Sequence, residues 1–204
     1  MNESGTTERR RQSGGRRAAQ RAATRQALRQ AGRSCFVESG YIATRVEDIA
    51  ARAEASPATF YLHFPAKRDL LLEFVTEVHD DGREYYSRLS EVIPARSPAR
   101  IEEWLRTTLI RWPEMAPTVR FIEEAAATDP VIRTGYADLF ALGRDTISAA
   151  LVRSGIADGS AQTRALLAMS LHHGLFQEYQ RGGFPDPQQT VPILSRMWWT
   201  ALFE

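Results

Sequence analysis

Apolar residues in this chain recur at helical spacing, and prolines and glycines divide them into segments of helix length. In the first such segment Leu28, Ala31, Cys35 and Phe36 fall on one face of a 3.6-residue period, which makes Cys35 a packing residue. No segment alternates apolar and polar residues with the period of a strand, and we find no internal repeat. The sequence therefore predicts an all-α protein.

Local signals mark where these helices begin and end. Gly40 and Gly155 stand at expected helix ends, where glycine adopts a left-handed backbone easily. Ser56-Pro57 and Asp129-Pro130 each combine an N-cap residue with a proline at the first helical position. Pro117 is expected to break or kink the start of its helix. After the first 65 residues, the expected helices span 66–90, 99–112, 113–128, 130–154, 160–181 and 188–203.

Charge is distributed unevenly along the chain. Residues 1–68 contain 13 Lys and Arg against 6 Asp and Glu, whereas residues 69–204 contain 13 against 19. A basic part beside an acidic remainder suggests that the first part meets a polyanion. We expect a disordered basic arm over 1–16, because it has almost no apolar residues. A basic helical domain over 17–65 and a larger one over 66–204 follow, linked through the helix 66–90.

Two short helices joined by a tight turn are expected between residues 44 and 65. Thr44 and Glu47 have the spacing of a capping box before the first helix. The second helix starts at Ser56-Pro57, and Phe60 and Phe64, four residues apart, would pack inward. This arrangement is typical of a helix-turn-helix, which also occurs in helical bundles that never bind DNA.

The residues of this segment resemble the N-terminal signature of the TetR (tetracycline-repressor-like) family. The resemblance covers about 45 residues, in order and at the right spacing. It is carried by the run 40–50 (GYIATRVEDIA), then by Ala53, Ser56, the run 59–64 (TFYLHF) and Lys67. It implies a transcriptional regulator with a three-helix DNA-binding domain, whose third helix enters the major groove, and a C-terminal helical domain for ligand binding and dimerisation.

The resemblance also implies roles for individual residues. Phosphate contacts would come from Thr44, Tyr61, His63 and Lys67. Base edges would be approached by Pro57, Ala58 and Thr59, and Arg45 would reach either a base or a phosphate. The arginines of the arm and first helix either line the DNA or belong to a solvated, N-terminal segment; they are Arg9, Arg10, Arg11, Arg16, Arg17, Arg21 and Arg25.

Three positions depart from the family pattern. Glu54 stands in the turn where glycine is common, and a left-handed backbone there costs a non-glycine residue about 1 kcal/mol. Ala55 replaces a usual valine, which thins the small core. Ala66 replaces a usual serine cap, a loss of about 1 kcal/mol. None of the three abolishes the motif.

The last two expected helices carry wider apolar arcs than one neighbouring helix can bury. By resemblance they would form a homodimer interface, for which we expect Leu171, Leu175, Leu194, Trp198, Trp199 and Leu202. The middle helices would enclose a pocket for a small apolar or aromatic effector. Its candidate residues, each of which could equally be ordinary core, are Trp104, Trp112, Met115, Phe121, Tyr136, Phe140 and Phe176.

Other classes of function have little support in the sequence. It has no glycine-rich phosphate loop, no nucleophile elbow and no cluster of metal-ligand residues, so we expect neither an enzyme nor a cofactor. His172 and His173 point to different faces of a helix, so no metal site is expected. We expect no signal peptide and no membrane span, hence a cytoplasmic protein. The remaining alternative is a helical adaptor that binds only proteins.

Overall fold

The computed structural model describes residues 3–183 and 186–204, which form α-helices and no strand, so the all-α prediction is confirmed. The chain divides into two compact units, Met1–Leu72 and Glu73–Glu204, and the division falls inside α4. The helices are α1 Glu3–Ser39, α2 Val46–Arg52, α3 Pro57–His63, α4 Lys67–Ser87, α5 Leu89–Val92, α6 Pro98–Thr128, α7 Pro130–Arg153, α8 Asp158–Gln180 and α9 Pro187–Phe203.

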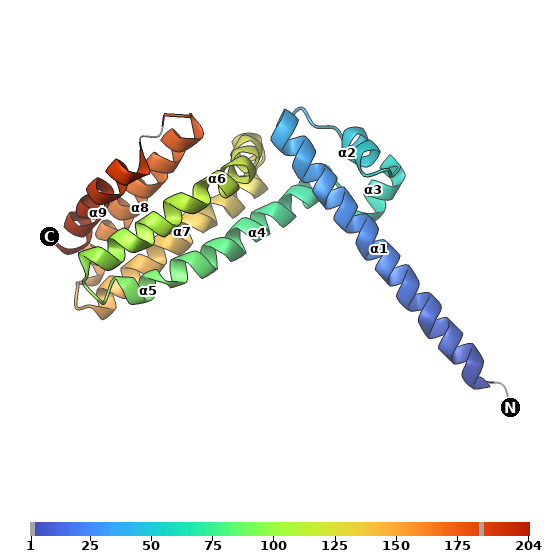
Figure 1. Ribbon diagram of the computed structural model, residues 1–204, viewed down its shortest axis with the longest axis horizontal. Helices are drawn as coiled ribbons and strands as arrows, with labels where there is room; N and C mark the ends of the chain where they lie inside the picture. Colours follow the sequence, from blue (N-terminus) through green and yellow to red (C-terminus); the bar gives the residue numbers. More distant parts are fainter. Residues whose placement is uncertain (1–2, 184–185) are drawn as a thin grey trace. The chain divides into compact units, whose positions relative to one another are not determined.

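The first unit packs α2 and α3 against the C-terminal half of α1, while the N-terminal half of α1 extends beyond them (Figure 1). Its core is apolar and contains Leu28, Phe36, Ile49, Phe60, Phe64 and Leu70. Gly32 lets α1 approach α4 closely, because a Cβ there would overlap the Leu70 side chain. Gly40 has a φ of 79°, as expected for a glycine that ends a helix.

The N-terminal arm differs from the prediction. We expected disorder over 1–16, but α1 begins at Glu3. Once the buried half of a helix is formed, each added residue forms one further hydrogen bond, so a polar segment can extend it without burying apolar surface. Residues 1–2 and the side chains of Arg9, Arg10 and Arg11 lie outside the described part of the chain.

The second short helix of the motif is capped as the sequence predicts, and the first is not. The Ser56 side chain accepts a hydrogen bond from the Thr59 amide at 3.1 Å. The N-cap of α2 is Arg45 rather than Thr44, and the Asp48 carboxylate accepts from the Arg45 amide at 3.1 Å. The predicted Thr44–Glu47 capping box is therefore wrong by one residue.

The second unit is a bundle of the C-terminal part of α4 with α5–α9 (Figure 1). Asp129 caps α7, and Gly155 has a φ of 88° after its end, as predicted. The expected division into helices 99–112 and 113–128, and a break at Pro117, are wrong: α6 is one helix that contains both Pro113 and Pro117. These prolines are exposed and lie four residues apart on one side of α6, so water can reach the carbonyls that lose a partner.

The packing of the opposite side of α6 explains why the helix survives two prolines. That side is buried and includes Trp112, Ala116 and Val119. Burial of one large apolar side chain contributes about 1.5–3 kcal/mol, which is comparable to the cost of about 3 kcal/mol for a proline in a helix. Tertiary packing thus overrides the local signal on which the sequence prediction relied.

Glu54 is left-handed, with a φ of 52°, in the turn between α2 and α3. We therefore expect Glu54→Gly to stabilise the first unit by about 1 kcal/mol relative to Glu54→Ala, which removes the same charge but keeps a Cβ. Hydrogen exchange of the α2 and α3 amides measures this, with protection about fivefold higher in the glycine variant. Equal protection in the two variants would contradict a strained backbone at this position.

Candidate nucleic-acid interface and interior cavity

The outer face of α3 presents side chains that do not pack into the core of the first unit. Pro57 and Ala58 are exposed, and Tyr61 is 52% exposed. Thr59 is half-buried, and its hydroxyl lies 2.9 Å from the Ser56 hydroxyl. The buried Phe60 on the other side of α3 fixes how this face is presented. A short helix of this kind offers apolar and hydroxyl contacts to base edges in a major groove.

Thr44 and Lys67 support the fold of the first unit, in contrast to their predicted phosphate roles. The Thr44 side chain is buried, and its hydroxyl donates to the Gly40 carbonyl at 2.6 Å. The Lys67 ammonium donates to the carbonyls of Tyr41 and Thr44, both at 2.6 Å, and lies 4.3 Å from the centre of the Tyr41 ring. Lys67 therefore ties the start of α4 to the loop between α1 and α2.

His63 and Arg25 meet at the C-terminal end of α3. The Arg25 guanidinium donates to the His63 carbonyl at 2.5 Å and covers the Phe64 ring at 4.2 Å. Partial burial, with added repulsion from Arg21 and Arg25, lowers the pKa of His63, so its imidazole is neutral at pH 7. Sequence reasoning assigned Arg25 to the basic arm and missed this supporting contact.

Two further contacts hold the elements of the first unit. Arg52 on α2 forms a two-pronged ion pair with Glu38 on α1, at 2.7 and 2.6 Å. Both side chains are well exposed, so the pair adds little to stability and mainly fixes orientation. At the start of α4 the Asp69 carboxylate accepts from the Ala66 amide at 2.7 Å, which is the half of a capping box that does not need a serine at position 66.

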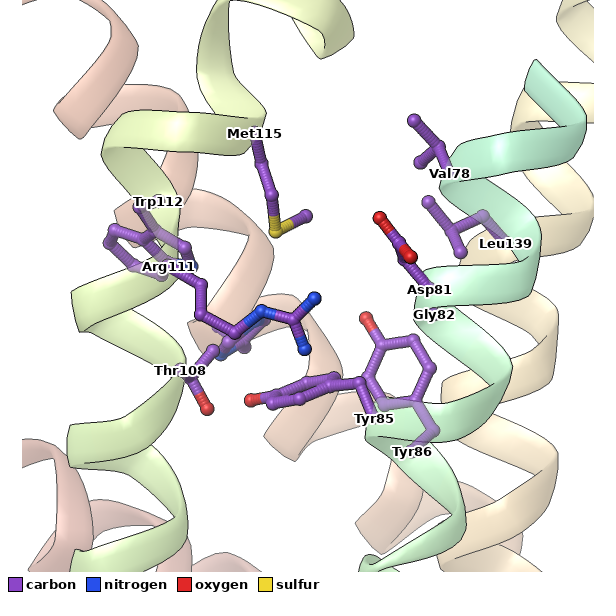
Figure 2. A pocket seen from close by; sticks show the side chains of 11 residues that line it. Val78, Asp81, Gly82, Tyr85, Tyr86, Thr108, Arg111, Trp112, Met115 and Leu139 are labelled. Atoms are coloured by element: carbon purple, nitrogen blue, oxygen red, sulfur yellow. The ribbon is translucent and has the colours of Figure 1, made fainter. Parts of the chain in front are cut away.

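A cavity opens inside the second unit between α4, α6, α7 and α8 (Figure 2). The space in it that a water-sized sphere can occupy is about 40 Å³, which is room for a few water molecules and well below the volume of an ordinary small-molecule site. The residues that line it are Val78, Asp81, Gly82, Tyr85, Tyr86, Thr108, Arg111, Trp112, Met115, Leu139 and His172. We call this space the first chamber.

A second chamber, also with about 40 Å³ of such space, adjoins the first and shares its wall. The shared residues are Tyr86, Trp112, Met115, Leu139 and His172, and the second chamber adds Val119, Tyr136, Phe140, His173 and Phe176. Beside it, the Glu123 carboxylate accepts hydrogen bonds from the Tyr136 hydroxyl at 2.5 Å and the Gln177 amide at 2.6 Å. These bonds join α6, α7 and α8 around the chamber.

Most of the predicted pocket residues line one chamber or the other. Trp112 and Met115 line both, whereas Tyr136, Phe140 and Phe176 line the second. Two predicted residues line neither: Trp104 stacks on the Tyr85 ring at 4.6 Å, and Phe121 packs against Phe74 at 5.5 Å. The polar residues of the first chamber were not predicted to line a pocket; they are Tyr85, Tyr86, Arg111 and His172.

His172 and His173 lie in separate surroundings, as the one-residue spacing predicts. His172 packs edge-on to the Trp112 ring at 5.5 Å, and His173 contacts the Phe140 ring at 4.2 Å. Burial, with a smaller contribution from His173, lowers the pKa of His172 to about 4, so that it is neutral at pH 7. Among the described residues, no three His, Cys, Asp or Glu side chains are grouped so as to hold a metal ion.

The predicted dimer residues require a correction. Leu194, Trp198 and Leu202 are buried within the protomer, and Trp198 packs against Trp104 at 5.1 Å. Leu171, Leu175 and Trp199 are only half-buried. The large apolar side chains that α8 and α9 leave exposed are Leu166, Leu167, Ile193 and Met197, at 46–52% exposure. We call these four the exposed α8/α9 face; a shallow hollow beside it includes Leu167, Leu171 and Met197.

Comparison with known proteins identifies this architecture. Residues 28–74 match the family model described as bacterial regulatory proteins, tetR family. The fold of the chain is similar to that of several solved regulators, whereas no curated protein sequence matches it. A tetR-family regulator from Mesorhizobium loti is 20% identical, with a TM-score of 0.66 over 89% of this chain and 94% of that one. A regulator from Aquifex aeolicus is 20% identical, with a TM-score of 0.64 over 88% and 97%.

A third similar structure contains a ligand. SmeT in complex with triclosan is 22% identical, with a TM-score of 0.71 over 88% of this chain and 91% of that one. SmeT is described as the repressor of the Stenotrophomonas maltophilia multidrug efflux pump SmeDEF. The chain thus has the fold of these regulators. Residues 28–74 of the N-terminal unit match the tetR family, and the resemblance predicted from the sequence is confirmed. None of the described helices is both long and apolar enough to span a membrane.

We expect Lys67→Met to destabilise the loop between α1 and α2, since it leaves the Tyr41 and Thr44 carbonyls without their donor. Amide protection in residues 40–46 should fall about tenfold, corresponding to about 1.4 kcal/mol. The slope of log affinity for DNA against log salt should stay constant, because the ammonium is engaged with carbonyls. Lys67→Arg is the control that keeps the charge. A slope reduced by about 0.9 with protection unchanged would instead show a phosphate contact.

Proposed function

We propose that this protein is a homodimeric repressor that binds a palindromic operator and leaves it when a small apolar or aromatic molecule fills the cavity of the second unit. The observation that carries this proposal is that α4 contributes residues to both units. Its first turns carry Lys67 and Leu70, which hold the DNA-binding unit together. Its later turns carry Val78, Gly82 and Tyr86, which line the first chamber.

One continuous helix therefore belongs to both sites, so a ligand that shifts α4 at the cavity also acts on the DNA-binding unit. A ligand achieves this only through a difference in affinity between the two states of the protein. A 100-fold loss of operator affinity requires about 2.7 kcal/mol of such coupling, and the operator must weaken ligand binding by the same factor.

The DNA contacts in this proposal come from α3 and the start of α2. Pro57, Ala58 and Thr59 approach base edges, and the exposed Tyr61 donates its hydroxyl to a phosphate. Arg45 is exposed at the first turn of α2 and contacts the backbone or a base. Thr44, Lys67 and His63 act indirectly, since their polar groups hold the loop and the end of α3 in place.

Selection from random duplexes by the full chain tests the DNA part of the proposal. We expect an inverted repeat with half-sites about one DNA turn, or a multiple of it, apart. Tyr61→Phe should then weaken binding by a similar factor on the selected and on random DNA, because a phosphate contact carries no base information. Failure to enrich any sequence would favour the protein-binding adaptor instead.

The effector part is tested with the selected operator and a panel of small aromatic compounds. A compound that binds the free protein should release the operator, and its own affinity should fall by the same factor when operator is present. Compounds that bind the second unit without changing operator affinity would contradict the proposed switch.

The exposed α8/α9 face is the proposed dimer interface, because several large apolar side chains gathered on two neighbouring helices are unusual on a monomer. Leu167→Glu should shift the protein to a monomer in sedimentation at micromolar concentration, since dimerisation through this face would bury an unpaired carboxylate from each copy. Operator affinity should fall with it. Ile110→Glu, at a 71% exposed position of α6, is the matched control. If the Leu167→Glu protein remains dimeric, the exposed α8/α9 face is not the dimer interface.

A further inference from the structure

Arg111 and Tyr86 place hydrogen-bond donors inside the first chamber. Figure 2 shows the Arg111 side chain reaching in from α6 and the Tyr86 hydroxyl pointing into the same space from α4. Neither side chain has a hydrogen bond or an ion pair with any residue that the structure describes. Burial raises the pKa of Tyr86, so its hydroxyl keeps its proton at neutral pH and can donate.

Other polar atoms around the chamber also lack partners. The Tyr85 hydroxyl and the His172 Nδ1 atom are buried without a hydrogen bond. Burial raises the pKa of Tyr85 well above its usual range, which makes it a second protonated hydroxyl. Because most buried polar atoms in proteins are hydrogen-bonded, several unpartnered ones around one cavity indicate that the cavity receives a polar group.

Asp81 is the one carboxylate in the lining of this chamber, and it stands opposite Arg111 (Figure 2). The two side chains make no ion pair with one another. Asp81 is exposed to solvent, whereas Arg111 is half-buried, so water screens the carboxylate more strongly than the guanidinium. The inner part of the chamber therefore favours a negative charge.

The remaining walls are apolar, and because the free space is about 40 Å³, a ring enters when flexible side chains such as Met115 move aside. Leu139 lies across the space from Arg111, Met115 lies above the guanidinium in this view, and Trp112 lies beside Arg111 on α6 (Figure 2). Met115 is adaptable in shape, and its sulfur makes favourable contacts with aromatic rings. The chamber thus has apolar walls on some sides and, on another, hydrogen-bond donors that lack an acceptor.

We propose, in a refinement that rests on the proposed function, that the effector is an aromatic carboxylate. Its ring lies among Trp112, Met115 and Leu139, and its carboxylate accepts hydrogen bonds from the Arg111 guanidinium and the Tyr86 hydroxyl. Charge-assisted bonds to a carboxylate are about twice as strong as neutral ones. Hydrogen bonds from the same donors to a neutral aromatic molecule are weaker, and the Arg111 guanidinium repels an aromatic cation.

Three probes of similar shape test this: 2-naphthoate, 2-naphthamide and 2-naphthylmethylammonium, titrated calorimetrically into the full-length protein without DNA. We expect naphthoate to bind at least tenfold more tightly than naphthamide, and the ammonium more weakly than both. Arg111→Gln should reduce naphthoate affinity at least tenfold and naphthamide affinity much less, and Arg111→Lys should restore part of the difference. Asp81→Asn should raise naphthoate affinity severalfold, because it removes the opposing charge.

Arg106→Gln is the matched control, since Arg106 lies on the same helix but pairs with Glu102 outside the cavity. Naphthoate binding in that variant should match the unaltered protein. The proposal is overturned if naphthoate does not bind at millimolar concentration, if the amide or the ammonium binds as tightly, or if Arg111→Gln leaves naphthoate affinity unchanged. Should all three probes bind equally and release the selected operator, the repressor proposal stands and the preference for an anion fails. Absence of any selected operator removes the repressor proposal alone.

Discussion

The apolar side chains of α4 are buried in both units, and the rest of the structure depends on this. Leu70 and Leu71 are fully buried where α4 belongs to the DNA-binding unit, and Phe74, Val75 and Val78 are buried where it belongs to the second. Burial of each such side chain contributes about 1.5–3 kcal/mol. The core of each unit includes side chains of this helix. Because α4 is one continuous helix, a change in its packing in one unit also acts on its residues in the other unit.

Local capping and turn chemistry were largely predictable from the sequence, because the signals act within a few residues. Ser56, Asp129 and Gly155 mark helix boundaries where the structure has them, and the left-handed Glu54 matches the expected strain in the turn. The proline rule failed in α6, where buried contacts from distant helices outweigh a local penalty. A pattern confined to one segment carries no information about the partners that segment will find.

Side-chain roles at the candidate sites were harder to predict. The family resemblance placed Thr44 and Lys67 at a phosphate, but the structure engages their polar groups with backbone carbonyls of the same unit. Trp198 was assigned to a dimer interface from the wide apolar arc of its helix and from the family resemblance, yet it is fully buried beside Trp104. Five of the seven residues predicted to line a pocket do line one of the two chambers. The donors of the first chamber were missed, because an arginine or a tyrosine in a helix is usually at the surface or in the core.

The exposed face of α3 has a consequence for how regulators of this kind diverge. Pro57, Ala58 and Leu62 are exposed, Leu62 to 74%, while Phe60 alone among the residues of α3 is fully buried. Substitutions on that face leave the core of the DNA-binding unit unchanged, and surface substitutions typically alter stability by less than about 0.5 kcal/mol. After a gene duplication, two copies could acquire different operators by drift at these positions, while each retained the same scaffold and the same cavity.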